Sequence, residues 1–289
     1  MNDSVAMSNS LLPQQPAPVT PAMEQLTAQA IAPVIPELMT VLLELRRNAD
    51  VELQPRFPHA NGKPYPLGRC DLISRHVLGQ LAALMQQQTP LPPSLQALRG
   101  FLGGGGEVRS VWGVLRGRYF QNAFQVGSLY IDVANDTVDP AKPPIEVLPW
   151  VESGMAEVED FQHFAAIAGS YWGASVYANT VLPGLAPILP AITVLPGQLP
   201  RLQSACDYMI EKCRRSDFKL NDAWLQGGPQ PPADVAAALL AATPEPLRPR
   251  QGGLEAALAA CDVVRNTGWG RDDAWRDARV KEYLTINAY

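Results

Sequence analysis

Cys70 is the residue whose type and position best suit nucleophilic chemistry. It follows the loop YPLGR and opens a stretch, residues 69–88, in which apolar side chains recur at helical spacing. Free amides and the dipole at a helix N-terminus stabilise a thiolate, so they lower the thiol pKa and favour attack on a carbonyl. Such a nucleophile needs a base that takes its proton and a carboxylate that orients the base.

The chain has 3 histidines that could serve as the base. His59 lies in the loop before the predicted helix and could fold back over Cys70. His76 is six residues further along the helix, about 600° around it at roughly 100° per residue, and so points away from Cys70. His163 belongs to the C-terminal half of the chain. We therefore retain His59 as the candidate base.

Acidic and amide side chains gather after the last predicted strand. Asp132, Asn135, Asp136 and Asp139 offer oxygen ligands for Ca²⁺ or Mg²⁺, but their spacing lacks the glycine and the distal glutamate of an EF-hand loop. Asn and Asp also form local backbone hydrogen bonds in turns. We interpret the group as a turn and expect no metal site.

Four consecutive glycines, residues 103–106, raise the question of a phosphate-binding loop. A P-loop is followed by Lys-Ser or Lys-Thr and by a helix, whereas this run precedes a predicted strand. We interpret it as a flexible turn and expect no cofactor.

A small sheet must position the partners of Cys70. Residues 108–115, 119–126 and 128–133 are rich in β-branched and aromatic residues, and glycines 117 and 127 separate them. This pattern predicts three antiparallel strands joined by short turns.

The second of these strands carries the candidate substrate-binding residues. Because a strand alternates its faces, Tyr119, Gln121 and Gln125 share one side. If that side faces Cys70, it forms a polar, neutral pocket suited to amide or sugar groups. We take Arg118, Tyr119 and Gln125 as the residues that would contact a substrate there.

Periodicity and proline content divide the chain into three parts. Residues 1–21 are rich in proline and glutamine and predict a disordered tail. Residues 22–150 predict an α+β core with a helix that ends near residue 48, a loop over 54–68, helices over 69–88 and 94–102, and the sheet. Residues 151–289 predict a helical extension, with helices over 158–179, 199–215, 232–242, 254–266 and 271–284.

Composition excludes several classes of function. The formal net charge is −5, without the clustered Lys and Arg that nucleic acid or an anionic membrane requires, so we expect neither partner. The 4 cysteines are scattered and form no CxxC pair, which favours a reducing compartment and no zinc. The N-terminus lacks a secretory signal and no apolar run approaches the roughly 20 residues of a membrane span. We expect a cytoplasmic protein.

The order of these features resembles the transglutaminase-like and papain-like cysteine enzymes, in the residues YPLGRC and LYIDVAND. In that superfamily a cysteine opens a helix, a histidine lies on the next strand of the core sheet, and an Asp or Asn follows on the strand after. The resemblance covers residues 65–139. It implies a small antiparallel sheet packed on the Cys-bearing helix, with Cys70 as nucleophile and Asp132 as the orienting carboxylate.

The sequence departs from this family at the histidine. Counting back along the shared Val-Gly-x-Leu-x-Ile-Asp run places that position at Gln121, or at Asn122 if the register slips by one. Neither side chain is a base near neutral pH. We therefore expect a catalytically incomplete module that binds a protein or peptide partner. The alternative is a cysteine-dependent acyltransferase or amidohydrolase that acts on a small amide-bearing substrate, with His59 or a partner's residue assisting Cys70.

Overall fold

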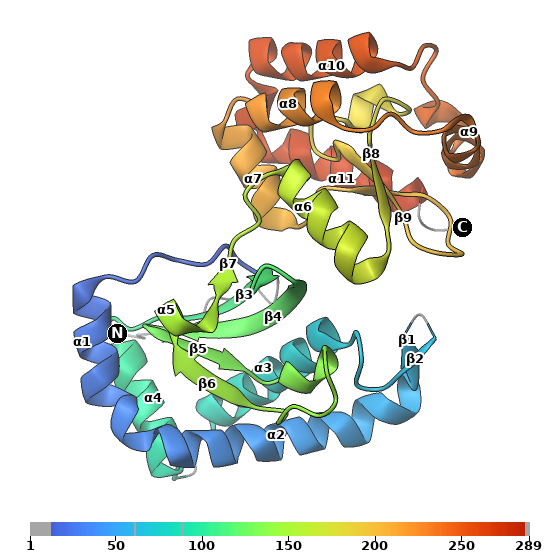
Figure 1. Cartoon of the computed structure of the whole chain (residues 1–289). Helices are drawn as coiled ribbons and strands as arrows, with labels where there is room; N and C mark the ends of the chain where they lie inside the picture. Colours follow the sequence, from blue (N-terminus) through green and yellow to red (C-terminus); the bar gives the residue numbers. More distant parts are fainter. Residues whose placement is uncertain (1–12, 61, 88–89, 287–289) are drawn as a thin grey trace. The chain divides into compact units, whose positions relative to one another are not determined.

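The chain is an α+β protein that divides into two units, residues Met1–Glu157 and Val158–Tyr289 (Figure 1). A computed structural model describes residues 13–60, 62–87 and 90–286. The expected boundary at residue 150 is therefore too early, because the short strand β7 (Met155–Ala156) still pairs with the N-terminal sheet.

The N-terminal unit contains a five-stranded antiparallel sheet with the order β6-β5-β4-β3-β7. The three predicted strands are confirmed as β3 (Val108–Leu115), β4 (Tyr119–Val126) and β5 (Leu129–Asp132). The sequence did not predict β7 or the edge strand β6 (Glu146–Pro149). Pro149 is the last residue of β6, and an edge strand tolerates proline.

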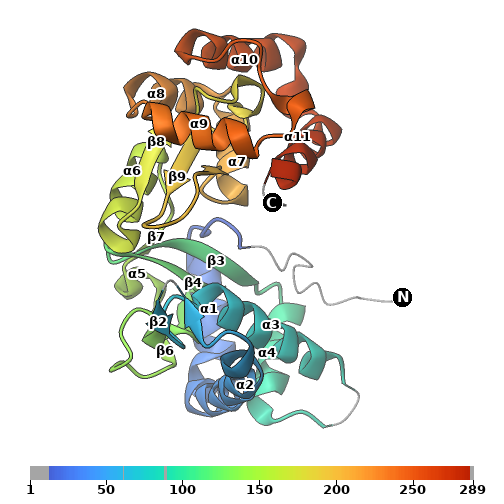
Figure 2. The same ribbon diagram turned by 90° about the vertical axis from the view of Figure 1, so that its right-hand side faces the viewer.

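Helices cover one face of this sheet (Figure 2). They and the remaining short elements are α1 (Pro21–Ala30), η1 (Ala32–Val34), α2 (Ile35–Arg56), β1 (His59–Ala60), β2 (Lys63–Pro64), α3 (Cys70–Gln86), α4 (Pro93–Gly103), η2 (Asn135–Thr137) and α5 (Trp150–Ser153). The helices predicted over 69–88 and 94–102 are confirmed. Their buried side chains form one core with the sheet residues Phe124, Val126 and Ile131.

The helix predicted to end near residue 48 continues to Arg56 as α2. The apolar stripe explains the difference, because Ala49 and Leu53 extend it by two further turns and both are buried. Arg46, which lies close to the predicted end, is itself buried in the unit. The predicted loop consequently begins at Phe57 and contains the two-residue strands β1 and β2.

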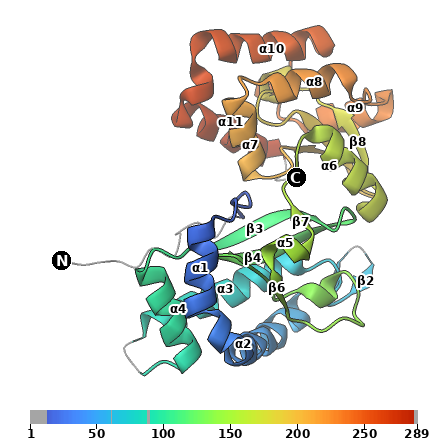
Figure 3. The same ribbon diagram turned by 60° about the vertical axis from the view of Figure 1, so that its left-hand side comes forward.

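Part of the predicted disordered tail is docked on the sheet. Residues 1–12 lie outside the described residues. Residues 13–20 lead from α1 to β3 (Figure 3), where Gln14 forms a parallel bridge with Val111. Proline content suggested disorder there, but extended backbone can still pair with a strand edge.

The C-terminal unit is not purely helical, contrary to the sequence prediction. It contains a three-stranded antiparallel sheet of β8 (Ser175–Ala178), β9 (Ala191–Val194) and β10 (Arg201–Gln203), in the order β10-β9-β8. The predicted helices over 158–179 and 199–215 each merged a short strand with a helix. The helical elements are α6 (Phe161–Ile167), η3 (Ala168–Trp172), η4 (Pro183–Leu185), α7 (Asp207–Arg215), α8 (Lys219–Gly227), α9 (Ala233–Ala242), η5 (Glu245–Leu247), α10 (Leu254–Thr267), η6 (Trp269–Arg271) and α11 (Asp273–Ile286).

One segment, Pro21–Arg56, is long and apolar enough to cross a membrane by length and composition alone. It runs through α1, η1 and α2, so the expectation that no apolar stretch approaches the length of a membrane span does not hold for this segment. Within the N-terminal unit Leu38, Leu42 and Leu45 of this segment are buried in the core. Of the most apolar window of the segment, 22% is buried.

Two hairpin glycines offer a test of how closely α1 packs on the sheet. Gly127 has φ +57°, and a Cβ there would lie 2.2 Å from Thr27 Oγ1 and 2.8 Å from the Phe101 ring. Gly117 has φ +64° with no heavy atom within 4 Å. Gly117→Ala should destabilise the protein by about 1 kcal/mol through backbone strain alone. Gly127→Ala adds overpacking and should cost about 2–4 kcal/mol in urea denaturation. Equal losses would contradict the packing.

Candidate functional site

Cys70 lies at the first residue of α3, where the sequence placed it. Its Sγ accepts a hydrogen bond from Nδ2 of Asn122 on β4, at 3.4 Å. One turn later, Ser74 Oγ donates to the backbone carbonyl of Asn122 at 3.3 Å. These two contacts tie the first turn of α3 to the sheet, and they place an amide at the side of the thiol where a base would act.

The Cys70 thiol is not activated by its surroundings. Burial, the strongest influence, raises its pKa to about 11, although the hydrogen bond from Asn122 lowers it. By exposed area Cys70 is half-buried, and the nearby Asp71 carboxylate also raises the pKa of its thiol, so a neutral thiol is expected at physiological pH. A neutral thiol that accepts one amide hydrogen bond behaves as a small apolar side chain with a weak polar contact.

Gln121 and Asp132 face the opposite side of the sheet from Cys70. On β4, Asn122 and Phe124 point toward the helices, whereas Ala123 packs with a separate cluster on the other face. The expected polar pocket of Tyr119, Gln121 and Gln125 around Cys70 is thus wrong. The reason is the alternation of the strand, since the residue that meets the thiol is the even-numbered Asn122.

Asp132 is fully buried in a hydrogen-bonded group on that other face. Its carboxylate accepts from Gln121 Nε2 at 2.7 Å, Tyr130 Oη at 2.9 Å and the Ala134 amide at 2.7 Å. Burial raises the pKa of Asp132 to about 6, against the lowering effect of these bonds, and Glu146 directly across from it on β6 raises it further. Asp132 therefore orients Gln121 and Tyr130, and among the described contacts none joins it to Cys70; its charge acts on the thiol only by raising the pKa of Cys70 further.

The remaining predicted residues have other partners. The Arg118 guanidinium lies 5.3 Å from the centre of the Tyr119 ring at the β3–β4 turn. The side-chain amide of Gln125 binds the backbone of Ala17. Its Oε1 accepts from the Ala17 N–H and its Nε2 donates to the Ala17 carbonyl, both at 2.8 Å.

The histidines do not supply a base to Cys70. His59 is exposed on β1, and among the described contacts none joins its imidazole to the thiol. His76 is half-buried, with its Nε2 3.5 Å from an oxygen of Glu52 on α2. His163 accepts the Glu159 amide at 3.3 Å within the C-terminal unit.

The acidic group after β5 is a turn for the most part. Asp139 accepts the Ala141 amide at 3.0 Å, and Asn135 donates to the Pro143 carbonyl at 3.0 Å. These local bonds confirm the interpretation of both residues. Among the described residues no cluster of His, Cys, Asp or Glu is arranged to hold a metal ion. Asp136 is the exception to the local pattern, because its carboxylate binds a side chain from α2.

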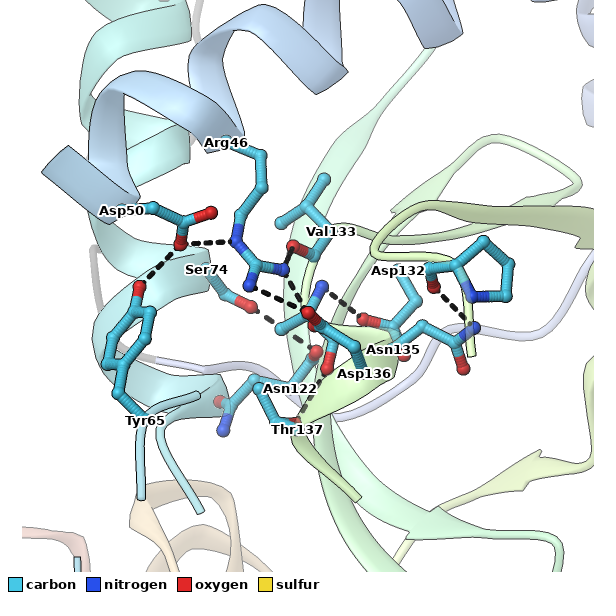
Figure 4. Close-up of polar contacts among 12 residues, drawn as sticks. Arg46, Asp50, Tyr65, Ser74, Asn122, Asp132, Val133, Asn135, Asp136 and Thr137 are labelled. Carbon is cyan, nitrogen blue, oxygen red and sulfur yellow. Dashed lines mark hydrogen bonds and ion pairs between the residues drawn. The ribbon is translucent and has the colours of Figure 1, made fainter. Parts of the chain in front are cut away.

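That side chain is Arg46, which sequence reasoning missed as a site residue (Figure 4). Only 2% of it is exposed. It donates to both oxygens of Asp136 at 2.8 and 3.0 Å, to the Val133 carbonyl at 2.9 Å and to Asp50 at 2.8 Å. The available signal was an arginine inside an apolar stripe with an aspartate four residues later.

The Arg46 group also fixes the loop that leads to Cys70. Tyr65 Oη donates to the same Asp50 oxygen at 2.5 Å, and the Gly68 amide donates to the carbonyl of Thr137 in η2 at 3.0 Å. Burial on its own would lower the pKa of Arg46, but the bonds to Asp136 and Asp50 more than offset it and the pKa is raised. Arg46 is therefore a permanent buried cation.

Comparisons with known proteins assign no relative. No protein-family model matches the chain, and neither the curated proteins nor the solved structures show a significant similarity to it. Function must be inferred from the fold and from the geometry around Cys70.

Arg46→Ala should be among the most destabilising substitutions in the N-terminal unit. It leaves Asp136, Asp50 and the Val133 carbonyl without their shared donor, and breaking a buried ion pair costs about 3–5 kcal/mol. The neighbouring Arg47 is exposed, so Arg47→Ala should change the free energy of unfolding by less than about 0.5 kcal/mol. Urea denaturation of both variants measures the difference, and a loss below about 1 kcal/mol for Arg46→Ala would refute this role.

Asp132 should make stability depend on pH. Its folded pKa of about 6 exceeds the unfolded value of about 3.9, so the folded state holds more protons between these values. The free energy of unfolding should therefore fall as pH rises from about 4 to above 6, by about 3 kcal/mol. Asp132→Asn removes this titration.

Denaturation midpoints at pH 4.5 and pH 8 test that effect. The stability of Asp132→Asn relative to the wild type should increase with pH, by up to about 3 kcal/mol. A difference that stays constant, or that changes in the opposite direction, would show that the carboxyl is not held at a raised pKa.

Proposed function

We propose that the N-terminal unit is a catalytically silent relative of the transglutaminase-like and papain-like cysteine enzymes, and that it acts as a binding module for a protein or peptide partner. Support comes from the arrangement of its elements. A cysteine opens α3, α3 packs on an antiparallel sheet, and a polar residue of β4 meets the sulfur. In this proposal the protein works in the cytoplasm, without a cofactor, a membrane or nucleic acid.

The contact between Asn122 and Cys70 carries the proposal. An amide cannot accept a proton near neutral pH, so it cannot generate the thiolate that acyl transfer requires. The raised pKa of Cys70, about 11, acts in the same direction. In this proposal, the pair retains the positions of a nucleophile and its base while serving only to hold α3 against β4.

The alternative, an acyltransferase or amidohydrolase that uses Cys70, lacks a comparable observation. It needs a base within hydrogen-bonding reach of the sulfur. His59 is exposed and has no described contact with Cys70, while Asp132 lies on the other face of the sheet. We therefore favour binding over catalysis.

A peptide is the ligand class that the polar groups fit. Asn122 pairs across the strands with Trp112, whose ring stacks on Phe120 with 4.8 Å between the ring centres. Asn122 and Phe120 are buried and Trp112 is half-buried, so the Trp112 ring is the part of this group that can offer a flat apolar contact to an extended chain. This chemistry suits amide-bearing partners better than charged ones.

Substituting a histidine for Asn122 would test the proposal. In the wild-type protein Cys70 should react with iodoacetamide roughly 300-fold more slowly than a free cysteine of pKa about 8.5, since its thiolate is scarce. Asn122→His places an imidazole against the sulfur and should raise the rate at pH 7 at least tenfold. The matched control Gln121→His puts the same ring on the opposite face and should leave the rate unchanged.

Peptide mapping by mass spectrometry assigns the alkylation to Cys70, and Cys206, Cys213 and Cys261 serve as internal references because burial raises the pKa of each. Circular dichroism shows whether both histidine variants remain folded. A wild-type Cys70 that alkylates as fast as a free thiol would contradict the proposal. Equal rates in the two histidine variants would contradict the likeness to the cysteine enzymes.

A further inference from the structure

The N-terminal strap, residues 13–18, is bound along the edge of β3 in the manner of a peptide ligand. The Gln14 amide donates to the Ser110 carbonyl at 2.7 Å, and the Trp112 amide donates to the Gln14 carbonyl at 3.4 Å. Together these bonds form a parallel bridge to Val111. Addition of an extended segment to a strand edge is a common mode of peptide recognition.

Gln125 provides a second, independent grip on the strap. Its Oε1 accepts the Ala17 amide and its Nε2 donates to the Ala17 carbonyl, both at 2.8 Å. Only 3% of Gln125 is exposed, so the amide is committed to this contact. A side-chain amide that reads both backbone groups of one residue accepts any residue except proline, which has no N–H.

The strap has the properties of an exchangeable occupant. None of its side chains is fully buried, although it has polar side-chain contacts: Arg109 donates to Gln14 Oε1 at 3.4 Å, and Gln15 donates to Glu157. Met23 and Leu26 of the following helix, by contrast, pack against the core. Segments with few buried apolar contacts open at a low free-energy cost. Pro16 and Pro18 flank the clamped residue and favour the extended conformation before binding, which limits the entropy lost on docking.

Space remains at the clamped position. A cavity of about 210 Å³ lies beside Ala17, and Glu107, Arg109 and Gln125 contribute to its wall. Glu107 and Arg109 form an ion pair at 2.5 Å, and Arg109 also donates to Gln14 Oε1 at 3.4 Å, so this wall is polar and its two charges balance. Because Ala17 lines this cavity, we expect a larger side chain with a polar tip at the same position to reach into it.

We propose that the edge of β3 and Gln125 form a binding site for an extended, proline-flanked peptide of another protein, with a residue larger than alanine at the clamp. The strap occupies this site in cis as a tethered competitor. The inference rests on the proposed binding function and names its partner class. It places the peptide on the face of the sheet opposite Cys70.

Nuclear magnetic resonance of the ¹⁵N-labelled full chain can test this site directly. The probes are three synthetic peptides: PQQPAPVT, which is residues 13–20, and its versions with tyrosine or proline at the clamp position. Ala17→Pro in the chain removes the N–H that Gln125 binds and should release the strap. The side-chain amide signals of Gln125 and the backbone amide of Trp112 report occupation of the edge.

In Ala17→Pro the tyrosine peptide should shift these signals at an at least fivefold lower concentration than PQQPAPVT, and the proline peptide should leave them unchanged. In the wild-type chain both binding peptides should be at least tenfold weaker, because a short tether keeps the strap at millimolar effective concentration. Adding Gln125→Leu to Ala17→Pro should abolish the shift of the Trp112 backbone amide, which is the reporter that this variant retains. If Ala17→Pro does not fold, Gln14→Pro removes the other strap donor and gives the same readout.

Several results would overturn the proposal. The first is an absence of shifts with every peptide at millimolar concentration, and the second is that the proline peptide causes shifts equal to those of the other peptides. The third is a wild-type dimer that Ala17→Pro dissociates, because such a dimer would show that the strap of a second copy of this chain binds the edge of β3. If no peptide binds and Cys70 is unreactive, the proposal of a catalytically silent module stands and only the peptide site on β3 is refuted. If the peptides bind and Cys70 is reactive, the peptide site stands and the proposal that the module is catalytically silent is refuted.

Discussion

The buried guanidinium of Arg46 is the contact on which the N-terminal unit depends. It joins α2 to the Val133 carbonyl and to Asp136, so one side chain links a long helix to the end of the sheet. Through Asp50 it also holds Tyr65 in the loop before α3. A buried cation is costly unless every donor is used, and this one has carboxylates on two sides. That requirement fixes where α3 begins and therefore where Cys70 lies.

With α3 fixed in this way, the alternation of β4 determines the chemistry of the site. Asn122 meets the Cys70 sulfur, while Gln121 turns to Asp132 on the other face of the sheet. The two faces thus divide the residues that a cysteine enzyme would bring together. One face holds a neutral thiol against an amide, and the other holds a buried carboxylate of raised pKa. The same opposite face carries Gln125, whose amide binds extended backbone.

Local patterns were sufficient for α3 and for strands β3 to β5, because periodicity and turn glycines specify each of them. They also placed Cys70 at a helix start. The side of the sheet to which Gln121 points could not be predicted. A shift of one residue moves every side chain of a strand to the other side, and only the packing of α3 on the sheet determines which register is formed. Arg46 looked like a helix end because its carboxylate partner Asp136 lies 90 residues away in the chain. Strands β8 to β10 have three or four residues each, too few for a periodic signal among prolines.

The central claim is that the thiol of Cys70 stays protonated and unreactive while it accepts a hydrogen bond from Asn122. The pKa of this thiol tests that claim most directly. The rate of Cys70 alkylation in the wild-type protein, followed by peptide mapping from pH 6 to pH 11, reports the pKa of this one thiol. A rate that keeps rising to the alkaline limit, with a pKa near 11, is the expected result. A plateau reached below about pH 8 would reveal a thiolate stabilised at neutral pH, and it would return Cys70 to the role of a nucleophile.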